Sequence, residues 1–101
     1  MSFFFHSIAS QPTNVSVGDE TETTAKVSYE TDGSLYRVQA VITNLNNGET
    51  MLKEVPAGDN MIPLDGLAPG TDYKVVLRGV TKDGRISDAT DEVTFKTGKF
   101  A

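Results

Sequence analysis

The sequence has no cysteine, no tryptophan and a single histidine, His6, among its 101 residues. Without cysteine, neither disulfides nor thiolate metal sites can stabilise the fold, so the burial of apolar side chains must do so. Acid–base and nucleophilic catalysis need titratable groups gathered beside one another. His6 has no partner at ligand or catalytic spacing. The composition therefore predicts no enzyme activity, no metal site and no cofactor.

Basic residues and long apolar runs are also scarce. Nine Lys and Arg against 14 Asp and Glu give a net charge of −5. The basic residues are scattered, so we expect no patch that binds nucleic acid. The longest apolar run is three residues, far short of the roughly 20 residues that span a membrane as a helix. We therefore expect no membrane insertion.

The start of the chain lacks the basic residues of a secretory signal, because no Lys or Arg precedes Lys26. This favours a complete small protein that is made in the cytosol and stays there or assembles there. The alternative is a domain excised from a longer protein and given a starting Met.

Two short acidic stretches offer oxygen ligands for a calcium ion. Their side chains are Asp19, Glu20, Glu22, Asp88, Asp91 and Glu92. Neither stretch has the regular spacing of an ion-binding loop, so we interpret both as solvated loops. The glycines mostly lie beside Asp, Asn or Pro, and none leads into a helix that could hold a phosphate group.

Apolar residues alternate with polar ones in short segments that turn signals separate, and no window of eleven residues shows helical spacing. A period of two is typical of half-buried strands. The predicted strands are residues 13–17, 24–30, 36–43, 49–53, 60–64, 72–80 and 92–97.

The alternation also predicts which side chains face the interior. The inward set in the central strands is Ala25, Val27, Tyr29, Tyr36, Val38, Ala40, Ile42, Ile62, Leu64, Tyr73, Val75, Leu77, Val93 and Phe95. The outward set of the third and sixth strands is Arg37, Gln39, Val41, Thr43, Lys74, Val76 and Arg78.

Turn residues add two expectations. Asn47-Gly48 suits a tight hairpin in which both residues have positive φ, and residues 56–59 are expected to form a loop. Pro63 lacks a backbone donor, which confines its strand to a sheet edge or to an irregular pairing. Seven short strands of this kind cover their apolar faces best as two packed antiparallel sheets, with a barrel as the alternative.

The segment from Leu64 to Tyr73, which reads LDGLAPGTDY, resembles the link between the fifth and sixth strands of fibronectin type III domains. The resemblance implies that the Tyr73 hydroxyl bonds back to the preceding loop as a tyrosine corner and that Leu67 closes the sandwich end. Pro69 and Gly70 complete the motif. Residues 36–38, 74–80 and 93–97 resemble other strands of the same family.

The resemblance implies an all-β, seven-stranded antiparallel sandwich over residues 12–98. An apolar arm, residues 1–11, precedes it, and a short tail, residues 99–101, follows it. Tyr29 stands where the family usually has a buried Trp, and its hydroxyl needs a partner. Because the sixth loop reads Asp83-Gly84-Arg85, the family's integrin-binding Arg-Gly-Asp is absent and cell adhesion does not carry over.

The arm contains three consecutive aromatic residues and an isoleucine: Phe3, Phe4, Phe5 and Ile8. Consecutive side chains point in different directions, so one sandwich cannot easily bury all of them. They either cover the open end of their own sandwich or dock into a groove on a neighbouring subunit. We favour docking, because burial of each such side chain stabilises an interface by roughly 1.5–3 kcal/mol.

A fibronectin-like module with an apolar arm implies a non-catalytic structural or interaction protein. We expect an accessory or decoration protein of a tailed bacteriophage particle, made in the host cytoplasm and anchored to a capsid or tail subunit, where sandwich domains recur. Homo-oligomers fit this expectation. The alternative is a spacer or binding domain cut from a secreted bacterial multidomain enzyme or adhesin, for which the absence of Trp weakens carbohydrate binding.

Overall fold

The computed structural model describes residues 9–100, which form seven β-strands and one short 3-10 turn. The elements are β1 (Thr13–Gly18), β2 (Ala25–Glu30), β3 (Arg37–Asn44), β4 (Thr50–Pro56), the turn Ala57–Asp59, β5 (Met61–Leu64), β6 (Asp72–Val80) and β7 (Val93–Lys96). Buried and exposed residues alternate strictly along β2, as its sequence AKVSYE predicts.

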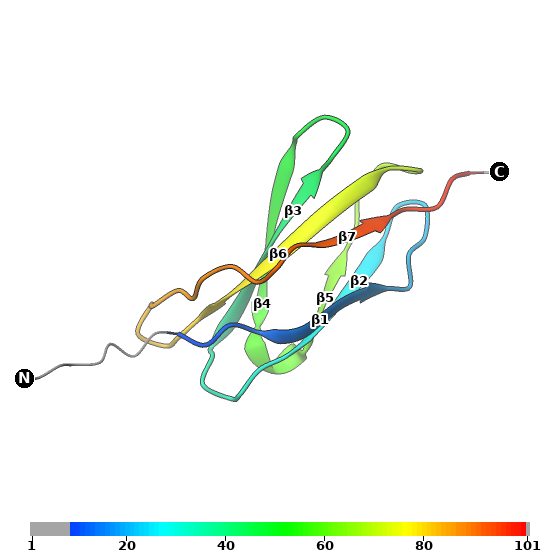
Figure 1. Ribbon diagram of the computed structural model, residues 1–101. Helices are drawn as coiled ribbons and strands as arrows, with labels where there is room; N and C mark the ends of the chain where they lie inside the picture. The colour runs from blue at the N-terminus through cyan, green and yellow to red at the C-terminus, as the bar shows by residue number, and fades with distance from the viewer. Residues whose placement is uncertain (1–8, 101) are drawn as a thin grey trace, which may run out of the picture.

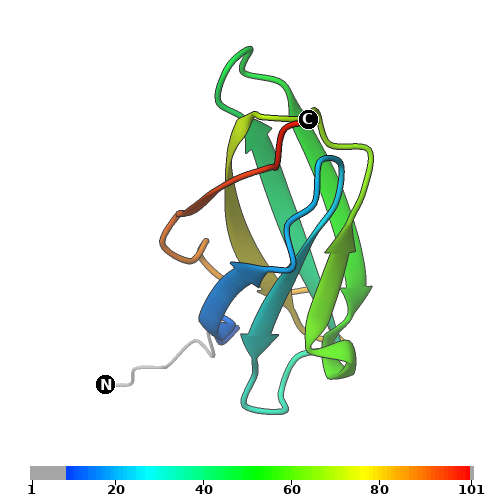
Figure 2. The same cartoon turned by 90° about the vertical axis from the view of Figure 1, so that its right-hand side faces the viewer.

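The strands form two antiparallel sheets, β1–β2–β5 and β4–β3–β6–β7. Figures 1 and 2 show the two sheets facing each other, with the first and the last described segments at opposite ends of the sandwich. The predicted seven-stranded sandwich is confirmed. The barrel alternative is wrong, because no strand of one sheet pairs with a strand of the other within residues 9–100.

The core lies between the sheets and is built from the inward positions of the strands. Its buried apolar members are Ala9, Ala25, Val27, Tyr29, Leu35, Val38, Ala40, Ile42, Ala57, Ile62, Leu64, Leu67, Tyr73, Val75, Leu77 and Phe95. Val15, Val17, Met51, Val55 and Val93 pack against this cluster and are partly buried. The alternation in the sequence therefore predicted most of the core.

The prediction for Tyr36 is wrong. Its side chain is 54% exposed, whereas that of the preceding residue, Leu35, is 9% exposed and belongs to the core. The β3 ladder begins only at Arg37. Leu35 instead fills the inward position at this end, where it packs over Gly79 of β6. Sequence alternation fails here because the chain is still turning into the strand.

The β3–β4 hairpin also differs from its prediction, because Asn47 does not have positive φ and Gly48 does, at 79°. Asn44 organises a longer loop instead: its N–H donates to the Glu49 carbonyl, and its side-chain oxygen accepts the Asn46 N–H at 2.8 Å. The hairpin therefore has no two-residue turn. β4 then continues to Pro56, three residues beyond the predicted Lys53.

The predicted loop after β4 contains the 3-10 turn, whose buried residue is Ala57. The Tyr29 hydroxyl donates to the Ala57 carbonyl at 3.0 Å, which provides the partner that a buried phenol needs. β5 pairs only with β2, and Pro63 lies opposite Lys26 in this pairing. The predicted place of β5 at a sheet edge is confirmed.

Residues 9–100 contain no helix with the length and apolar character to span a membrane.

Candidate protein-interaction site

The described end of the arm, residues 9–11, is fastened to two loops at one end of the sandwich. Ala9 is 6% exposed. The Ser10 hydroxyl donates to Asp32 Oδ2 at 2.8 Å, and the Gln11 side-chain amide donates to the Ala89 carbonyl at 2.9 Å. The chain therefore enters the sandwich between the β2–β3 loop and the β6–β7 loop (Figure 1).

Asp32 organises the β2–β3 loop. Its Oδ1 accepts both the Ser34 N–H at 2.9 Å and the Ser34 hydroxyl at 2.6 Å, while Oδ2 accepts the Ser10 hydroxyl. These donors, the Ser34 hydroxyl first among them, lower the pKa of Asp32 from 3.8 to about 2. A carboxylate that stays ionised keeps all three hydrogen bonds. The loop is therefore held in one shape at neutral pH.

The β6–β7 loop is held by a second carboxylate. Asp83 accepts the Thr81 hydroxyl and forms an ion pair with Arg85 at 2.9 Å. The Thr81 hydroxyl, and secondly Arg85, lower the pKa of Asp83 from 3.8 to about 2. Ile86, beyond this turn, is 53% exposed. The loop thus presents one apolar side chain on a polar, ordered frame.

A shallow hollow of about 320 Å³ lies beside the arm base, between the start of β1 and the approach to β7. It is lined by Gln11, Pro12, Thr13, Asn14, Val15, Thr90, Asp91 and Val93. Partly buried valines form its apolar part, and side-chain amides and hydroxyls form its rim. Such a surface suits contact with a peptide segment of another protein.

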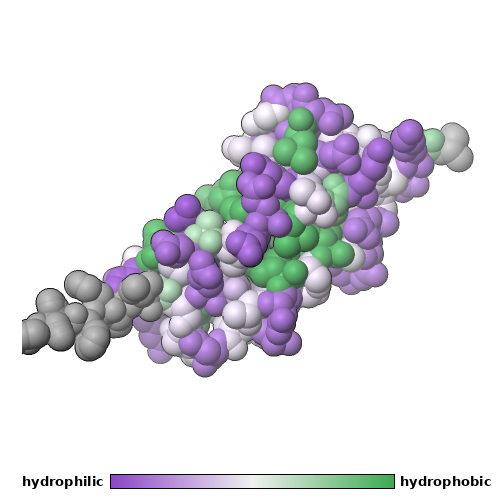
Figure 3. Space-filling view, viewed as in Figure 1, coloured by the Kyte–Doolittle hydropathy of each residue, from purple (hydrophilic) through white to green (hydrophobic). Residues whose placement is uncertain are grey.

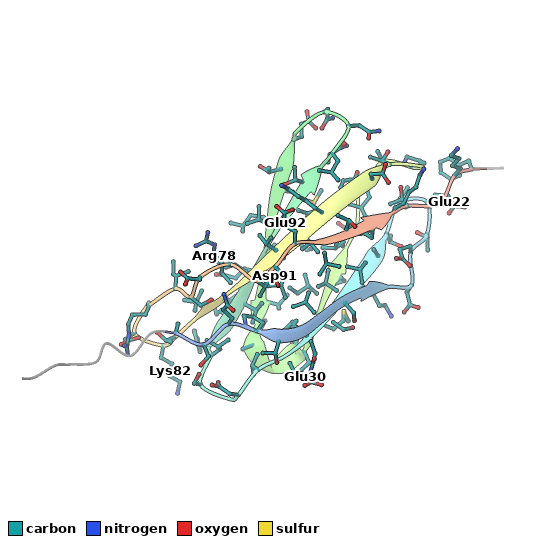
Figure 4. All side chains as sticks on the ribbon, viewed as in Figure 1. Glu22, Glu30, Arg78, Lys82, Asp91 and Glu92 are labelled. Carbon is teal, nitrogen blue, oxygen red and sulfur yellow. The ribbon has the colours of Figure 1, made fainter. Side chains whose placement is uncertain are left out.

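The part of the chain that the structure describes has no group of three His, Cys, Asp or Glu side chains placed to hold a metal ion. The two acidic stretches lie apart: Figure 4 places Glu22 near the C-terminal end, and Asp91 and Glu92 near the middle of the sandwich. They do not combine into one acidic site. The predicted arm residues Phe3, Phe4, Phe5, His6 and Ile8 lie outside the described residues.

The sequence model of the fibronectin type III domain matches residues 10–96. The chain belongs to the fibronectin type III family. Such domains are generally non-catalytic modules that mediate contacts between proteins. The family assignment therefore supports an interaction module and carries no particular partner with it.

Solved fibronectin type III domains share the fold at low identity. The fn3 domain of human contactin 1 has a TM-score of 0.83 at 15% identity. The match covers 100% of this chain and 87% of that chain. The fn3 domain of human collagen alpha-1(XX) has a TM-score of 0.81 at 22% identity, with 99% of this chain and 95% of that chain covered.

A curated relative is similar over a shorter stretch. Human von Willebrand factor A domain-containing protein 1 is 49% identical over 43 residues, which are 43% of this chain and 10% of that protein. The match therefore spans about a tenth of the relative's length.

The fibronectin type III corner motif lies at the end opposite the arm base. The Tyr73 hydroxyl accepts the Ala68 N–H at 2.7 Å, and the Tyr73 ring stacks on Phe95 with centroids 5.5 Å apart. Leu67 is buried, and Gly70 has φ of 60°. Pro69 accepts the Thr71 hydroxyl through its carbonyl at 2.8 Å. These residues hold the β5–β6 link in place, at the end of the sandwich away from the arm base.

Sequence reasoning missed the residues that fasten the arm. Asp32-Gly33-Ser34 is a local signal for an Asx turn, because an Asp side chain often accepts N–H groups two residues on. The Ser10–Asp32 and Gln11–Ala89 bonds join residues 22 and 78 positions apart. Only the packing of three separate segments creates those contacts, so no pattern in one sequence could have predicted them.

Proposed function

We propose that this fibronectin type III domain is a non-catalytic module that binds another protein with the end of the sandwich that carries the arm. The observation that carries the proposal is the attachment of residues 9–11 to both the β2–β3 and β6–β7 loops. A partner that takes up the apolar arm is thereby brought against the two loops as well. Phe3, Phe4, Phe5 and Ile8 supply the apolar anchor, and the loops supply the polar rim.

As the setting of this contact we propose a virus particle, specifically that of a tailed bacteriophage, with a capsid or tail subunit as the partner. The support is the apolar arm on a small sandwich domain, together with the general use of such domains as particle decorations. The module reaches the virion by assembly in the host cytoplasm.

A domain of a longer secreted protein, acting as a spacer or binding unit, is the second candidate. One observation favours it: the matched stretch in von Willebrand factor A domain-containing protein 1 is about a tenth of that protein. A domain of this size would likewise be one part of a longer chain. An antibody to the domain separates the candidates, because it detects a small protein in purified particles or a much longer chain in the medium.

Substitution of the four apolar arm residues by Ser tests the docking contact. We expect the variant to keep the melting temperature of the full chain to within about 2 °C, because the proposal places these side chains against the partner rather than in the core of their own domain. We expect the variant no longer to co-sediment with purified particles of the bacteriophage proposed as its setting. Phe100→Ser is the matched control, since Phe100 is 67% exposed at the other end of the molecule.

Two results would contradict the docking contact. A large loss of thermal stability in the arm variant would mean that the phenylalanines belong to the core of their own domain. Unchanged co-sedimentation of the arm variant would mean that another surface makes the contact. Failure of the full chain itself to bind particles would exclude the virion setting.

A further inference from the structure

The outer face of the β4–β3–β6–β7 sheet, which is turned away from β1–β2–β5, carries an apolar row. Leu52, Val41 and Val76 lie next to one another across β4, β3 and β6, because the register pairs Val41 with both of the others. Leu52 is 61% exposed, and the two valines are half-buried. Figure 3 looks onto the edge of the sandwich beside β7 and β1 and shows apolar surface there between polar side chains; the row itself follows from the strand register.

A row of opposite charges lies directly beside the apolar row. The register aligns Glu54, Gln39 and Arg78 across the same three strands. The Gln39 amide donates to Glu54 Oε2 at 3.0 Å, which lowers the pKa of Glu54. The Arg78 guanidinium has no ion-pair or hydrogen-bond partner within residues 9–100, and Figure 4 shows it pointing away from the other sheet. The row is thus negative on β4 and positive on β6.

This arrangement is complementary to itself. A two-fold axis parallel to β3 and passing over Val41 exchanges the positions of β4 and β6 between two copies. Leu52 of one copy then faces Val76 of the other, and Glu54 faces Arg78, twice in each dimer. An isologous interface requires this kind of self-complementary pattern.

The other two-fold arrangement of the same face is unfavourable. An axis at right angles to the strands, again passing over Val41, would place Arg78 of one copy opposite Lys74 of the other. Arg78 and Lys74 lie on the same face of β6, on either side of Val76. That arrangement gives Arg78 no carboxylate partner across the interface, because Lys74 is itself a cation and is paired with Glu92 at 2.9 Å. In the favoured arrangement the Arg37 side chains of the two copies meet on the axis, and each is offset by its own Glu54, whose Oε1 lies 2.9 Å from Arg37 Nε.

We propose that this face is the contact between two copies of the chain, packed sheet against sheet. The proposal does not depend on the arm contact, which lies at the end of the sandwich. Three strands spaced about 4.8 Å apart and seven residues long present of the order of 400 Å² per copy, about half of a standard interface. We therefore expect a weak dimer that forms at high local concentration, as within an assembly.

Sedimentation velocity of the full chain from about 20 μM to about 1 mM tests the proposal in the range where weak interfaces assemble. We expect concentration-dependent dimerisation. Arg78→Glu and Glu54→Arg are each expected to weaken it about tenfold or more, because each places like charges together twice. The double variant restores the opposite pairing across the interface but lacks the Arg37–Glu54 ion pair, so we expect its association constant to exceed that of either single variant by at least about threefold.

Lys82→Glu is the matched control, since it makes the same charge change in the β6–β7 loop, away from the face (Figure 4). It should leave dimerisation unchanged, and so should the arm variant described above. A full chain that stays monomeric at the highest concentration overturns the proposal. So do single reversals that associate like the original chain, a double variant that does not recover, or dimerisation that only the arm variant abolishes.

Discussion

Three hydroxyl side chains take the place of backbone groups beside β6. The buried Ser87 hydroxyl accepts the Gly79 N–H at 2.8 Å, and the Thr90 hydroxyl accepts the Leu77 N–H at 2.9 Å. At the other end, Thr97 accepts the Thr71 N–H at 2.9 Å. A buried donor without a partner destabilises a fold more than a typical hydrogen bond stabilises it. These hydroxyls therefore let β6 extend beyond the short strand β7.

Ser87→Ala should destabilise the domain by about 1–3 kcal/mol, because it leaves the buried Gly79 N–H without its acceptor. Urea unfolding followed by circular dichroism measures the change. Ser28→Ala, at an exposed position of β2, is the control and should lie within about 0.5 kcal/mol of the original chain. Equal stability of the two variants would show that water or a neighbouring group replaces the Ser87 hydroxyl without cost.

At the scale of elements, β6 joins the core to the interaction end. It pairs with β3 and β7, and near its end Gly79 passes beneath two other segments. A Cβ added at Gly79 would lie 2.4 Å from a Leu35 methyl group and 2.7 Å from the Ser10 carbonyl oxygen. Gly79 is therefore the position that allows the β2–β3 loop and the arm base to close over the strand.

Gly79→Ala should cost about 1–3 kcal/mol, because Leu35 and the Ser10 backbone must move to admit the methyl group. Calorimetric melting measures the loss, and weaker particle binding should accompany it, since the arm base is displaced. Gly58→Ala is the matched control, as nothing lies within 4 Å of its added Cβ. A Gly79→Ala variant as stable as Gly58→Ala would contradict the close approach.

At the scale of the whole molecule, the two carboxylates with the lowest pKa hold the same end. Asp32 and Asp83 each have a pKa lowered from 3.8 to about 2. A lowered pKa in the folded state means that the ionised form is the one that folding favours. The stability that each contributes is complete above the unfolded pKa and is lost as the pH falls towards the folded pKa.

The domain should therefore lose stability between about pH 4 and about pH 2, and the arm base should loosen over the same interval. Urea midpoints at pH 7, 4 and 2 measure the effect. The double variant Asp32→Asn and Asp83→Asn should be less stable at neutral pH and should show a smaller loss on acidification. An acid loss as large as that of the original chain would assign the effect to other carboxyl groups.

Much of the fold could be predicted from local patterns. Strict alternation in residues 25–30 and 72–80 predicted both strands and their inward faces, because a strand places successive side chains on opposite faces. Tyr36 and Asn47 show the limit: one lies where the chain enters a strand and the other in a turn, and there the conformation depends on Leu35 and Asn44 as well. The outward positions of Val41 and Val76 were predicted, but Leu52 beside them was not.

By itself, the sequence determined the all-β class, most of the strand positions and the family, because these follow from neighbours along the chain. The tertiary structure alone decided which segments meet. It brought Ser10 to Asp32, and it aligned Glu54 and Arg78 on either side of β3. The physical reason is that strand order and register determine such contacts, and they depend on how the whole core packs rather than on any local stretch of residues.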